Sequence, residues 1–271
     1  MLNLKILHWK LFGLLLIPCS IMAGDQLDFS MGYEKSSGNY GLENTTEITS
    51  IPLTMQYIDD AWRLSLSVPF ISVTGDGSVT PGVNGVMESN SGSNTMMGSG
   101  PGSTFTVATV DSNSGLGDIT SSVSYAFMPQ NSDMFYELMA SVKWGTASAK
   151  KDLGSGENDY SVSLYSLYEK HEVKPFINIG YLLIGDTGVT DYDDVLFMSS
   201  GFMYSVSPQI SFSFSYNYQQ ATTNTTDEAQ SFGLYANQRF SQQWSGSVFL
   251  FSGLTDSVAD TDVGLSLIHS F

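Results

Sequence analysis

Cysteine is nearly absent from this chain, and its absence excludes several kinds of site. The only cysteine, Cys19, lies near the N-terminus, in a segment that we predict to be a cleaved leader. A mature chain without thiols has no disulfide framework and no cysteine-based metal centre. Cys19 itself fits a lipoprotein acceptor poorly, because Pro18 stands where such sites carry a small residue.

Basic residues are also scarce. The chain has 10 lysines and arginines against 27 acidic residues, which gives a formal net charge of −17 at pH 7. Nucleic-acid binding rewards clustered basic side chains, so the composition excludes that class of partner. The excess carboxylates fit solvated loops. As an alternative, they fit divalent cations that bridge the protein to anionic lipopolysaccharide.

Long apolar runs are missing beyond the leader. No later segment approaches the roughly 20 apolar residues that a transmembrane helix needs. The chain begins with a segment that carries Lys5 and Lys10, a short apolar core at 11–17 comes next, and small residues follow, as in a secretory signal peptide. We expect residues 1–23 to be this signal peptide and residues 24–271 to form one domain.

Apolar and polar residues instead alternate along nearly the whole mature chain. Between Gln209 and Tyr218, aromatic or aliphatic side chains occupy every second position, and serines and Asn217 occupy the others. Period-2 alternation predicts β-strands. In a soluble sandwich the apolar face would turn to a core, whereas in a membrane barrel it faces lipid and the polar face lines the lumen.

The connections between the expected strands distinguish these two architectures. Short turns such as 59–60 and 207–208 alternate with longer polar loops such as 150–158 and 222–227, which is how outer-membrane barrels are connected. We therefore predict an all-β fold, a transmembrane antiparallel up-and-down β-barrel of about 12 strands, with 10 or 14 as alternatives. The barrel is expected in the outer membrane of a Gram-negative bacterium, with both termini in the periplasm. The expected strands are at about 26–37, 46–58, 61–74, 115–128, 133–147, 159–170, 174–185, 194–207, 209–221, 228–241, 243–254 and 260–271.

The last expected strand ends on an aromatic residue, Phe271. A terminal strand of this kind is typical of barrels that the outer-membrane assembly machinery inserts, so we expect that machinery, lipid and lipopolysaccharide as partners. Other aromatic residues gather near strand ends, as in the interfacial girdles of membrane proteins. They are Tyr57, Trp62, Phe127, Phe240 and Trp244 near short turns, and Tyr33, Trp144, Tyr181 and Tyr218 toward long loops.

One connection is much longer than the others. Residues 75–114 are rich in glycine, serine, asparagine and methionine, and we expect a long extracellular loop there. Its β-prone run at 104–110 would either extend a hairpin above the membrane or fold into the mouth. Loops of this length are uncommon unless they are functional or disordered.

Catalytic residues are not evident. After the leader only His171, in a short turn, and His269, on the lipid-facing side of its strand, remain. A hydrolytic site requires a nucleophile with a histidine base nearby. We therefore expect no enzymatic activity and no cofactor.

Projecting the alternation inward predicts a set of lumen residues. A charge facing lipid would cost about 2–4 kcal/mol near the midplane, so the charged strand residues are assigned to the lumen. Two roles remain open, namely mutually neutralising pairs that brace the barrel and a constriction that selects solutes. The charged candidates are Asp28, Arg63, Glu137, Lys143, Glu169 and Arg239, and the aromatic candidates are Phe135, Tyr165, Phe176 and Tyr235.

Two groups of loop carboxylates deserve separate mention because oxygen ligands suit calcium. Asp191, Asp193 and Asp194 form one group, and Asp256 and Asp260 belong to the other. Neither group has the spacing of an EF-hand loop. We predict no defined metal site there and keep calcium binding as the alternative to a solvated surface.

Two short motifs carry a family resemblance. The third expected strand runs through Val68-Pro69-Phe70, and Gly115-Leu116-Gly117-Asp118 leads into the fourth. The pair resembles the outer-membrane transporter-like barrels of the MetA-pathway phenol degradation family, named for the meta-cleavage pathway, whose members show a Gly-Leu-Gly-Asp turn after a strand ending in Val-Pro-Tyr or Val-Pro-Phe. The resemblance implies passage of small, often hydrophobic or aromatic molecules, and it supplies no catalytic residues.

The residues of the second motif also have a physical interpretation. Gly115 and Gly117 permit backbone conformations closed to other residues, and Asp118 can accept hydrogen bonds from nearby amides. We expect the motif to shape the rim of the barrel rather than to contact a substrate.

Two functions are consistent with this pattern. The first is an outer-membrane channel for passive passage of small, hydrophobic or aromatic solutes. The alternative is a structural or surface-interaction barrel with a blocked lumen, whose extracellular loops bind partners. Barrels of this size can be either open or filled by their own side chains.

Overall fold

The computed structural model describes residues 25–42, 44–75, 79–81, 87–89, 111–188 and 190–271. The expected signal peptide and the β-prone run at 104–110 lie outside these residues. Within the described ranges, no helix is both long and apolar enough to span a bilayer.

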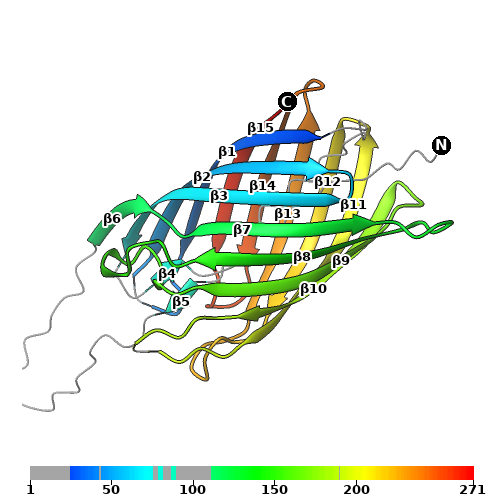
Figure 1. Ribbon diagram of the computed structural model, residues 1–271. Coiled ribbons are helices and arrows are strands. Elements are labelled where there is room, and N and C mark those ends of the chain that lie inside the picture. The colour runs from blue at the N-terminus through cyan, green and yellow to red at the C-terminus, as the bar shows by residue number, and fades with distance from the viewer. Residues whose placement is uncertain (1–24, 43, 76–78, 82–86, 90–110, 189) are drawn as a thin grey trace, which may run out of the picture.

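Nearly all of the described chain is β-strand, in one closed antiparallel sheet (Figure 1). Strands that are neighbours in the sequence pair with one another, and the first pairs with the last to close the ring. Since β6 and β7 both pair with β3, they share one position, and the ring has 12 positions. This confirms the predicted all-β up-and-down barrel. The barrel strands are β1 (Gln26–Gly38), β2 (Thr46–Asp59), β3 (Trp62–Gly75), β6 (Asp111–Leu116), β7 (Ile119–Phe127), β8 (Met134–Trp144), β9 (Asp159–Tyr168), β10 (Val173–Leu183), β11 (Val195–Ser207), β12 (Ile210–Gln219), β13 (Ala229–Arg239), β14 (Trp244–Gly253) and β15 (Thr261–Ser270).

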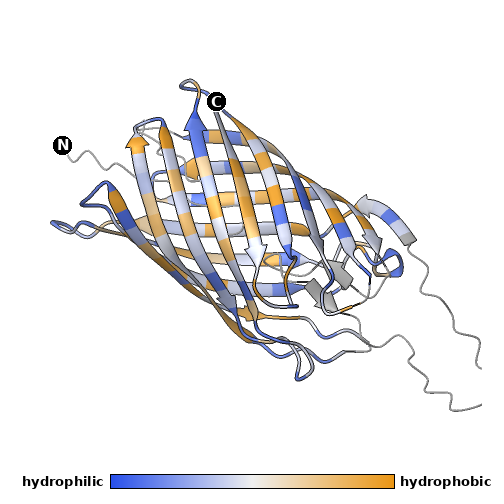
Figure 2. Cartoon of the chain, turned by 180° about the vertical axis from the view of Figure 1, so that it is seen from behind, coloured by the Kyte–Doolittle hydropathy of each residue, from blue (hydrophilic) through white to orange (hydrophobic). Residues whose placement is uncertain are grey.

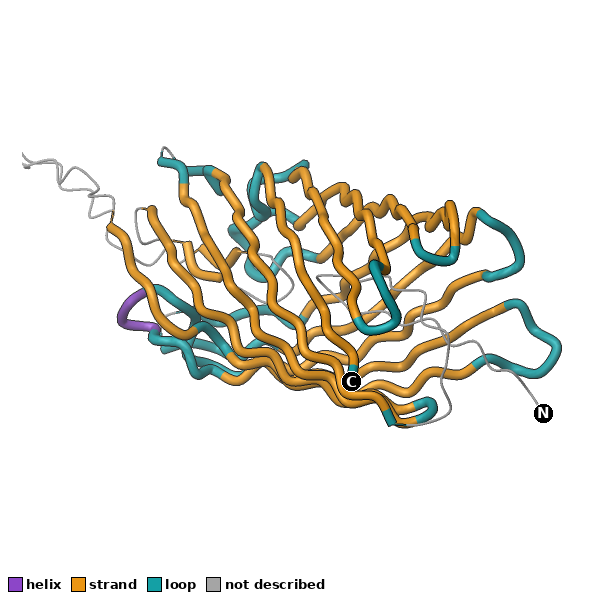
Figure 3. Tube along the Cα trace, turned by 90° about the horizontal axis from the view of Figure 1, so that it is seen from above, coloured by secondary structure: helices purple, strands orange, loops and turns teal. Residues whose placement is uncertain are grey.

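Short and long connections alternate around the ring, as expected. The connection at 60–61 between β2 and β3 is a tight turn, whereas the next one, 76–110, is the longest in the chain. That long connection contains a small hairpin, β4 (Val79–Pro81) with β5 (Met87–Ser89). Figure 3 shows that loops and turns gather at the two ends of the strands. We call these the short-turn end and the long-loop end.

The two faces of the sheet differ as the alternation predicts. On β9, Tyr160, Val162 and Leu164 are about half exposed on the outer face, whereas Tyr165 and Leu167 are buried on the inner face. Apolar and polar residues alternate in the same way along the other strands (Figure 2). An outer face of this kind is stable when it is in contact with lipid. In water its apolar area would stay exposed to solvent, which is unfavourable.

The seam of the barrel involves the last residue. The backbone N–H of Phe271 donates to the carbonyl oxygen of Leu27 at 2.9 Å. Its ring lies on the outer face, 5.7 Å from that of Phe29 between ring centroids. The terminal aromatic residue therefore extends the β1–β15 pairing and adds to the apolar outer surface.

The fourth expected strand differs from the prediction. The alternation suggested one strand at 115–128, but the strand begins at Asp111 and is interrupted at Gly117 and Asp118. β6 pairs with β3 alone, and only β7 continues to β8. The Gly-Leu-Gly-Asp motif lies at the point where this strand breaks.

The barrel lumen as the candidate functional site

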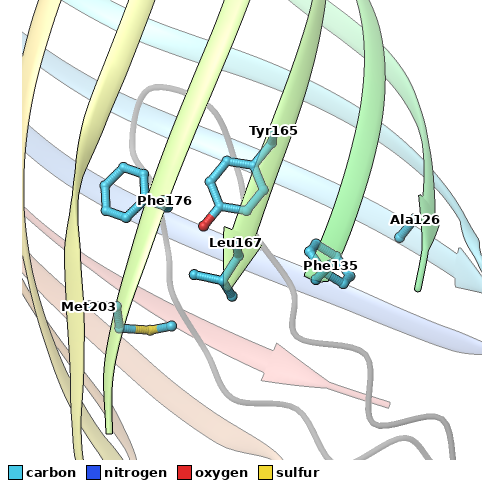
Figure 4. Close-up of a cluster of buried hydrophobic side chains, with 6 residues drawn as sticks. All are labelled: Ala126, Phe135, Tyr165, Leu167, Phe176 and Met203. Carbon is cyan, nitrogen blue, oxygen red and sulfur yellow. The ribbon is translucent and has the colours of Figure 1, made fainter. Parts of the chain in front are cut away.

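An apolar patch covers part of the inner wall toward the short-turn end. It consists of side chains from five consecutive strands, β7 to β11, and all of them are at most 6 % exposed. Figure 4 shows these side chains on the inner side of the neighbouring strands. The patch comprises Ala126, Phe135, Tyr165, Leu167, Phe176 and Met203.

Three of the four predicted lumen aromatics meet in this patch. The ring of Tyr165 lies between Phe135, 6.3 Å away, and Phe176, 5.9 Å away, measured between ring centroids. Both distances lie in the range where aromatic pairs attract one another. Tyr235 is also on the inner wall, but on β13, where it contacts Phe249 and Phe251 instead.

The sequence prediction missed several inward apolar residues. Leu167 follows the alternation of Tyr165 and could have been assigned from it. Phe249 and Phe251 lie in an uninterrupted apolar run, 248–251, where alternation carries no information. The strand register shows which residues of this run face inward. Phe249 pairs across to Gly264, and its ring covers that glycine on the inner face.

A buried ion pair borders the apolar patch. Arg63 Nη1 on β3 lies 2.7 Å from Glu137 Oε1 on β8, and the two side chains are only 3 % and 2 % exposed. Ser124 on β7 donates to the same carboxylate oxygen at 2.5 Å. The pair spans β7 on the inner wall, so it ties three neighbouring strands together and its two charges neutralise each other.

A second charged cluster lies toward the long-loop end. Lys143 Nζ on β8 is 2.6 Å from Asp159 Oδ2 on β9 and 3.6 Å from Asp118 Oδ2 at the strand break. It also donates to Ser155 in the loop between β8 and β9 at 3.3 Å. Lys143 therefore joins two strands, the motif aspartate and the loop.

The loop at 145–158, which contains the short 3-10 helix η2 (Ala149–Lys151), packs against the inner wall at this end. Its Leu153 is 2 % exposed and clusters with Ile48, Ile71 and Val73, which face inward from β2 and β3. The loop thus narrows the mouth of the barrel.

The Gly-Leu-Gly-Asp motif holds this loop in place. Asp118 Oδ1 accepts a hydrogen bond from the Ala147 N–H at 2.8 Å. A Cβ at Gly115 would lie 3.0 Å from Leu153 Cδ1, and one at Gly117 would lie 3.0 Å from Pro69 Cγ. The glycines therefore leave room for the loop and for Pro69 within β3, so the two family motifs contact each other.

The remaining predicted lumen charges are dispersed. Asp28 on β1 accepts a hydrogen bond from Gln26 at 2.7 Å, and Glu169, just after β9, lies 3.6 Å from Lys174. Arg239 on β13 has a buried Nη2 without a hydrogen-bond partner among the described residues. Among the six predicted residues, Arg63 and Glu137 form an ion pair with each other, and the other contacts given above are to different residues.

The acidic loops and the histidines form no cluster. Asp194 Oδ1 accepts a hydrogen bond from Ile184 N–H at 3.2 Å within its own loop. Across the described ranges, no three His, Cys, Asp or Glu side chains lie close enough together to hold a metal ion. His269 packs on the outer face between Trp244 and Phe271, with ring centroids 4.6 and 4.3 Å away.

Comparison with solved structures places this fold among bacterial outer-membrane channels. An outer-membrane channel from Pseudomonas putida F1 aligns with a TM-score of 0.65 at 14 % identity, over 93 % of this chain and 97 % of that one. The KdgM porin aligns with a TM-score of 0.54 at 11 % identity (90 % and 99 % of the two chains), and the NanC porin with 0.52 at 10 % (90 % and 98 %). At these identities the likeness concerns the fold. No family model matches the sequence, and no curated protein matches it.

Proposed function

We propose that this protein is an outer-membrane channel for passive passage of small hydrophobic or aromatic solutes. The observation that carries the proposal is the apolar patch, because it provides aromatic and aliphatic contacts on the inside of a closed barrel. A pore for small ions is lined mainly by polar and charged side chains instead. A solute with an aromatic ring can exchange water for contacts with Phe135, Tyr165 and Phe176 as it passes.

The proposed location has independent support. The apolar outer face, the signal-peptide pattern and the terminal Phe271 suit a barrel delivered to the outer membrane by the assembly machinery. The short-turn end, which carries both termini of the barrel, would face the periplasm. The long acidic loops would then face outward, beside lipopolysaccharide and its bridging divalent cations.

We further propose membership of the MetA-pathway phenol degradation family. Gly117 contacts Pro69, so the two short motifs pack against each other. Together they hold the loop at 145–158 in the mouth of the barrel. The motif then shapes the rim and does not contact a substrate. The role proposed for the protein is transport without catalysis.

Solute flux into liposomes tests the function. Relative to protein-free liposomes, the purified barrel in proteoliposomes should accelerate the entry of phenol or benzyl alcohol more than the entry of an uncharged polyol of similar size. Replacing both Tyr165 and Phe176 by serine should reduce this preference roughly thirtyfold, since each of the two aromatic contacts contributes about 1 kcal/mol. The matched control is Tyr160→Ser, which removes a tyrosine from the outer face of the same strand and should leave the preference unchanged.

A second function is favoured by one specific observation. The patch side chains are almost fully buried, and the loop at 145–158 packs into the mouth, as in a barrel with a blocked lumen whose loops bind partners. The same liposomes separate the two proposals. If no conductance is seen and no solute enters faster than in protein-free liposomes, the channel proposal is wrong and the blocked barrel stands.

A further inference from the structure

A second group of aromatic rings faces the lumen from β13 and β14. These strands lie on the β15 side of the seam between β1 and β15. Tyr235 on β13 lies 6.3 Å from Phe249 and 5.3 Å from Phe251 on β14, and the two phenylalanines are 5.5 Å apart, all between ring centroids. Glycines make room for two of these rings, since Phe251 covers Gly233 and Phe249 covers Gly264. We call Tyr235, Phe249 and Phe251 the aromatic trio.

Two carboxylates share the inner wall with the aromatic trio. Glu34 on β1 pairs across to Gly264, and Asp262 on β15 pairs across to Ser36 on one side and Phe251 on the other. Glu34 and Asp262 are therefore diagonal neighbours on one face, at about 7–8 Å. Two like charges at this spacing repel each other, and the repulsion is relieved by a cation beside them or by protonation of one carboxylate.

No basic side chain among the described residues neutralises this pair. Lys35, next to Glu34 in the sequence, points outward and pairs with Glu47 at 3.0 Å. The inward basic residues Arg63, Lys143 and Lys174 have their own acidic partners on β8 and β9 or next to them. The carboxylates beside the trio thus differ from the balanced ion pair beside the apolar patch.

The carboxylates and the rings are in direct proximity. A Cβ built on Gly264 would meet the ring of Phe249 and, at 3.1 Å, the Cγ of Glu34. The ring of Phe249 and the side chain of Glu34 therefore both lie next to Gly264, which has no side chain of its own. In the pairing between β14 and β15, Asp262 lies directly across from Phe251.

Unpartnered polar atoms extend the same surface. Ser213 pairs across to Tyr235, and Asn237 follows Tyr235 on the inward face of β13. The two residues are only 4 % and 2 % exposed, yet Ser213 Oγ and both amide atoms of Asn237 have no hydrogen-bond partner among the described residues. Buried polar groups of this kind cost free energy unless a partner satisfies them.

We propose that the aromatic trio, Glu34 and Asp262 form a binding subsite for aromatic ammonium ions inside the lumen. The ammonium group is held by the two carboxylates and by the negative faces of the rings, while the solute's own ring packs on the trio. The subsite rests on the proposed channel function and deepens it. Neutral aromatic solutes use the apolar patch, and cationic ones have this additional site.

Equilibrium binding to the purified full-length barrel tests the proposal. The probes are benzylammonium, its neutral analogue benzyl alcohol and the anionic benzoate, measured by calorimetry. The wild type should bind benzylammonium about tenfold more tightly than benzyl alcohol, and benzoate least. The double variant Glu34→Gln with Asp262→Asn should remove that preference, and Phe249→Leu should reduce it about threefold, as expected for one cation–π contact.

Controls separate this proposal from the channel proposal. Glu47→Gln removes a carboxylate from the outer face near the same end and should leave the preference unchanged. Gly264→Ala, which fills the point where Phe249 and Glu34 meet, should reduce the preference without changing any charge. Heat-modifiable gel mobility reports folding, and the single Glu34→Gln variant replaces the double variant if the latter does not fold.

Two outcomes overturn the subsite. One is equal binding of benzylammonium and benzyl alcohol by the wild type, and the other is a preference that persists in the folded Glu34→Gln variant. A failure of the channel proposal looks different, because benzyl alcohol would then enter proteoliposomes no faster than protein-free liposomes, even though benzylammonium binding in detergent is intact.

Discussion

Two arginines inside the barrel, Arg63 and Arg239, occupy similar positions on their strands but differ in their surroundings. Arg63 and Arg239 both come from the inward face of a strand near the short-turn end. Arg63 is buried against Glu137, whereas Arg239 has no acidic partner at ion-pair distance within the described ranges. The first residue therefore suits the bracing role, and the second suits the selective role.

The Arg63–Glu137 pair makes a stability prediction. Glu137→Gln would leave a buried guanidinium without its counter-charge, which should lower the free energy of unfolding by about 3–5 kcal/mol. Urea unfolding in lipid vesicles, followed by tryptophan fluorescence, measures this. Glu47→Gln, which removes an exposed partner of Lys35, should cost no more than about 1 kcal/mol. Equal losses in the two variants would show that the buried pair is not a brace.

Arg239 makes a selectivity prediction. Removing an uncompensated positive charge from the lumen should shift the permeability ratio toward cations by about twofold, because a unit charge ~10 Å away in water contributes about 0.4 kcal/mol. Reversal potentials of Arg239→Ala in planar bilayers under a salt gradient provide the measurement. The neutral double replacement Arg63→Met with Glu137→Leu should not move the ratio. A ratio that stays constant in Arg239→Ala would remove this residue from the conduction path.

At the scale of elements, the break between β6 and β7 and the loop at 145–158 form one unit. The break frees Asp118 from the β-ladder, and its carboxylate accepts from the backbone of Ala147 and lies near Lys143. Leu153 then packs on the inward apolar residues of β2 and β3. A continuous strand would leave the loop without this anchor.

Limited proteolysis checks the anchor. Asp118→Ala should increase the rate of tryptic cleavage after Lys150 or Lys151 roughly tenfold, since one charge-assisted hydrogen bond contributes about 1.5 kcal/mol. Both lysines lie in the short helix of the loop. Asp186→Ala, which removes a carboxylate that accepts from the Tyr192 N–H in another loop, should leave cleavage at these lysines unchanged. Cleavage at the wild-type rate in Asp118→Ala would mean that apolar packing alone holds the loop.

At the scale of the whole molecule, the barrel has an apolar exterior and a mixed interior. Leu164 and Ser161 illustrate the difference, because both belong to β9 but face opposite sides. Leu164→Arg should lower the free energy of unfolding in bilayers by about 2–4 kcal/mol, since the charge would face hydrocarbon. Ser161→Arg should cost clearly less, because the lumen accepts a charge. Similar costs in urea titrations would contradict the assignment of the outer face to lipid.

Much of the architecture follows from sequence alone. The number of strands, their order and their inward and outward faces could be predicted because alternation with period 2 and alternating loop lengths are local properties. Phe135, Tyr165 and Phe176 follow the same alternation, and their side chains lie together in the apolar patch. Local patterns did not place the break at Gly117, since glycine and aspartate occur both in turns and in strands.

The sequence by itself determined the class of fold and the two faces of those strands in which apolar and polar residues alternate clearly. Only the tertiary structure decided which inward residues meet, because contacts across a barrel depend on strand register and on loops that fold into the mouth. Register brought Arg63 to Glu137 and left Glu34 and Asp262 without a basic partner in the described part of the chain. Register also determines that Phe249 and Phe251 face inward. The sequence does not show this, because the neighbouring residues in the run are apolar too. The chemistry proposed for the lumen depends on these contacts between distant segments, which no local pattern contains.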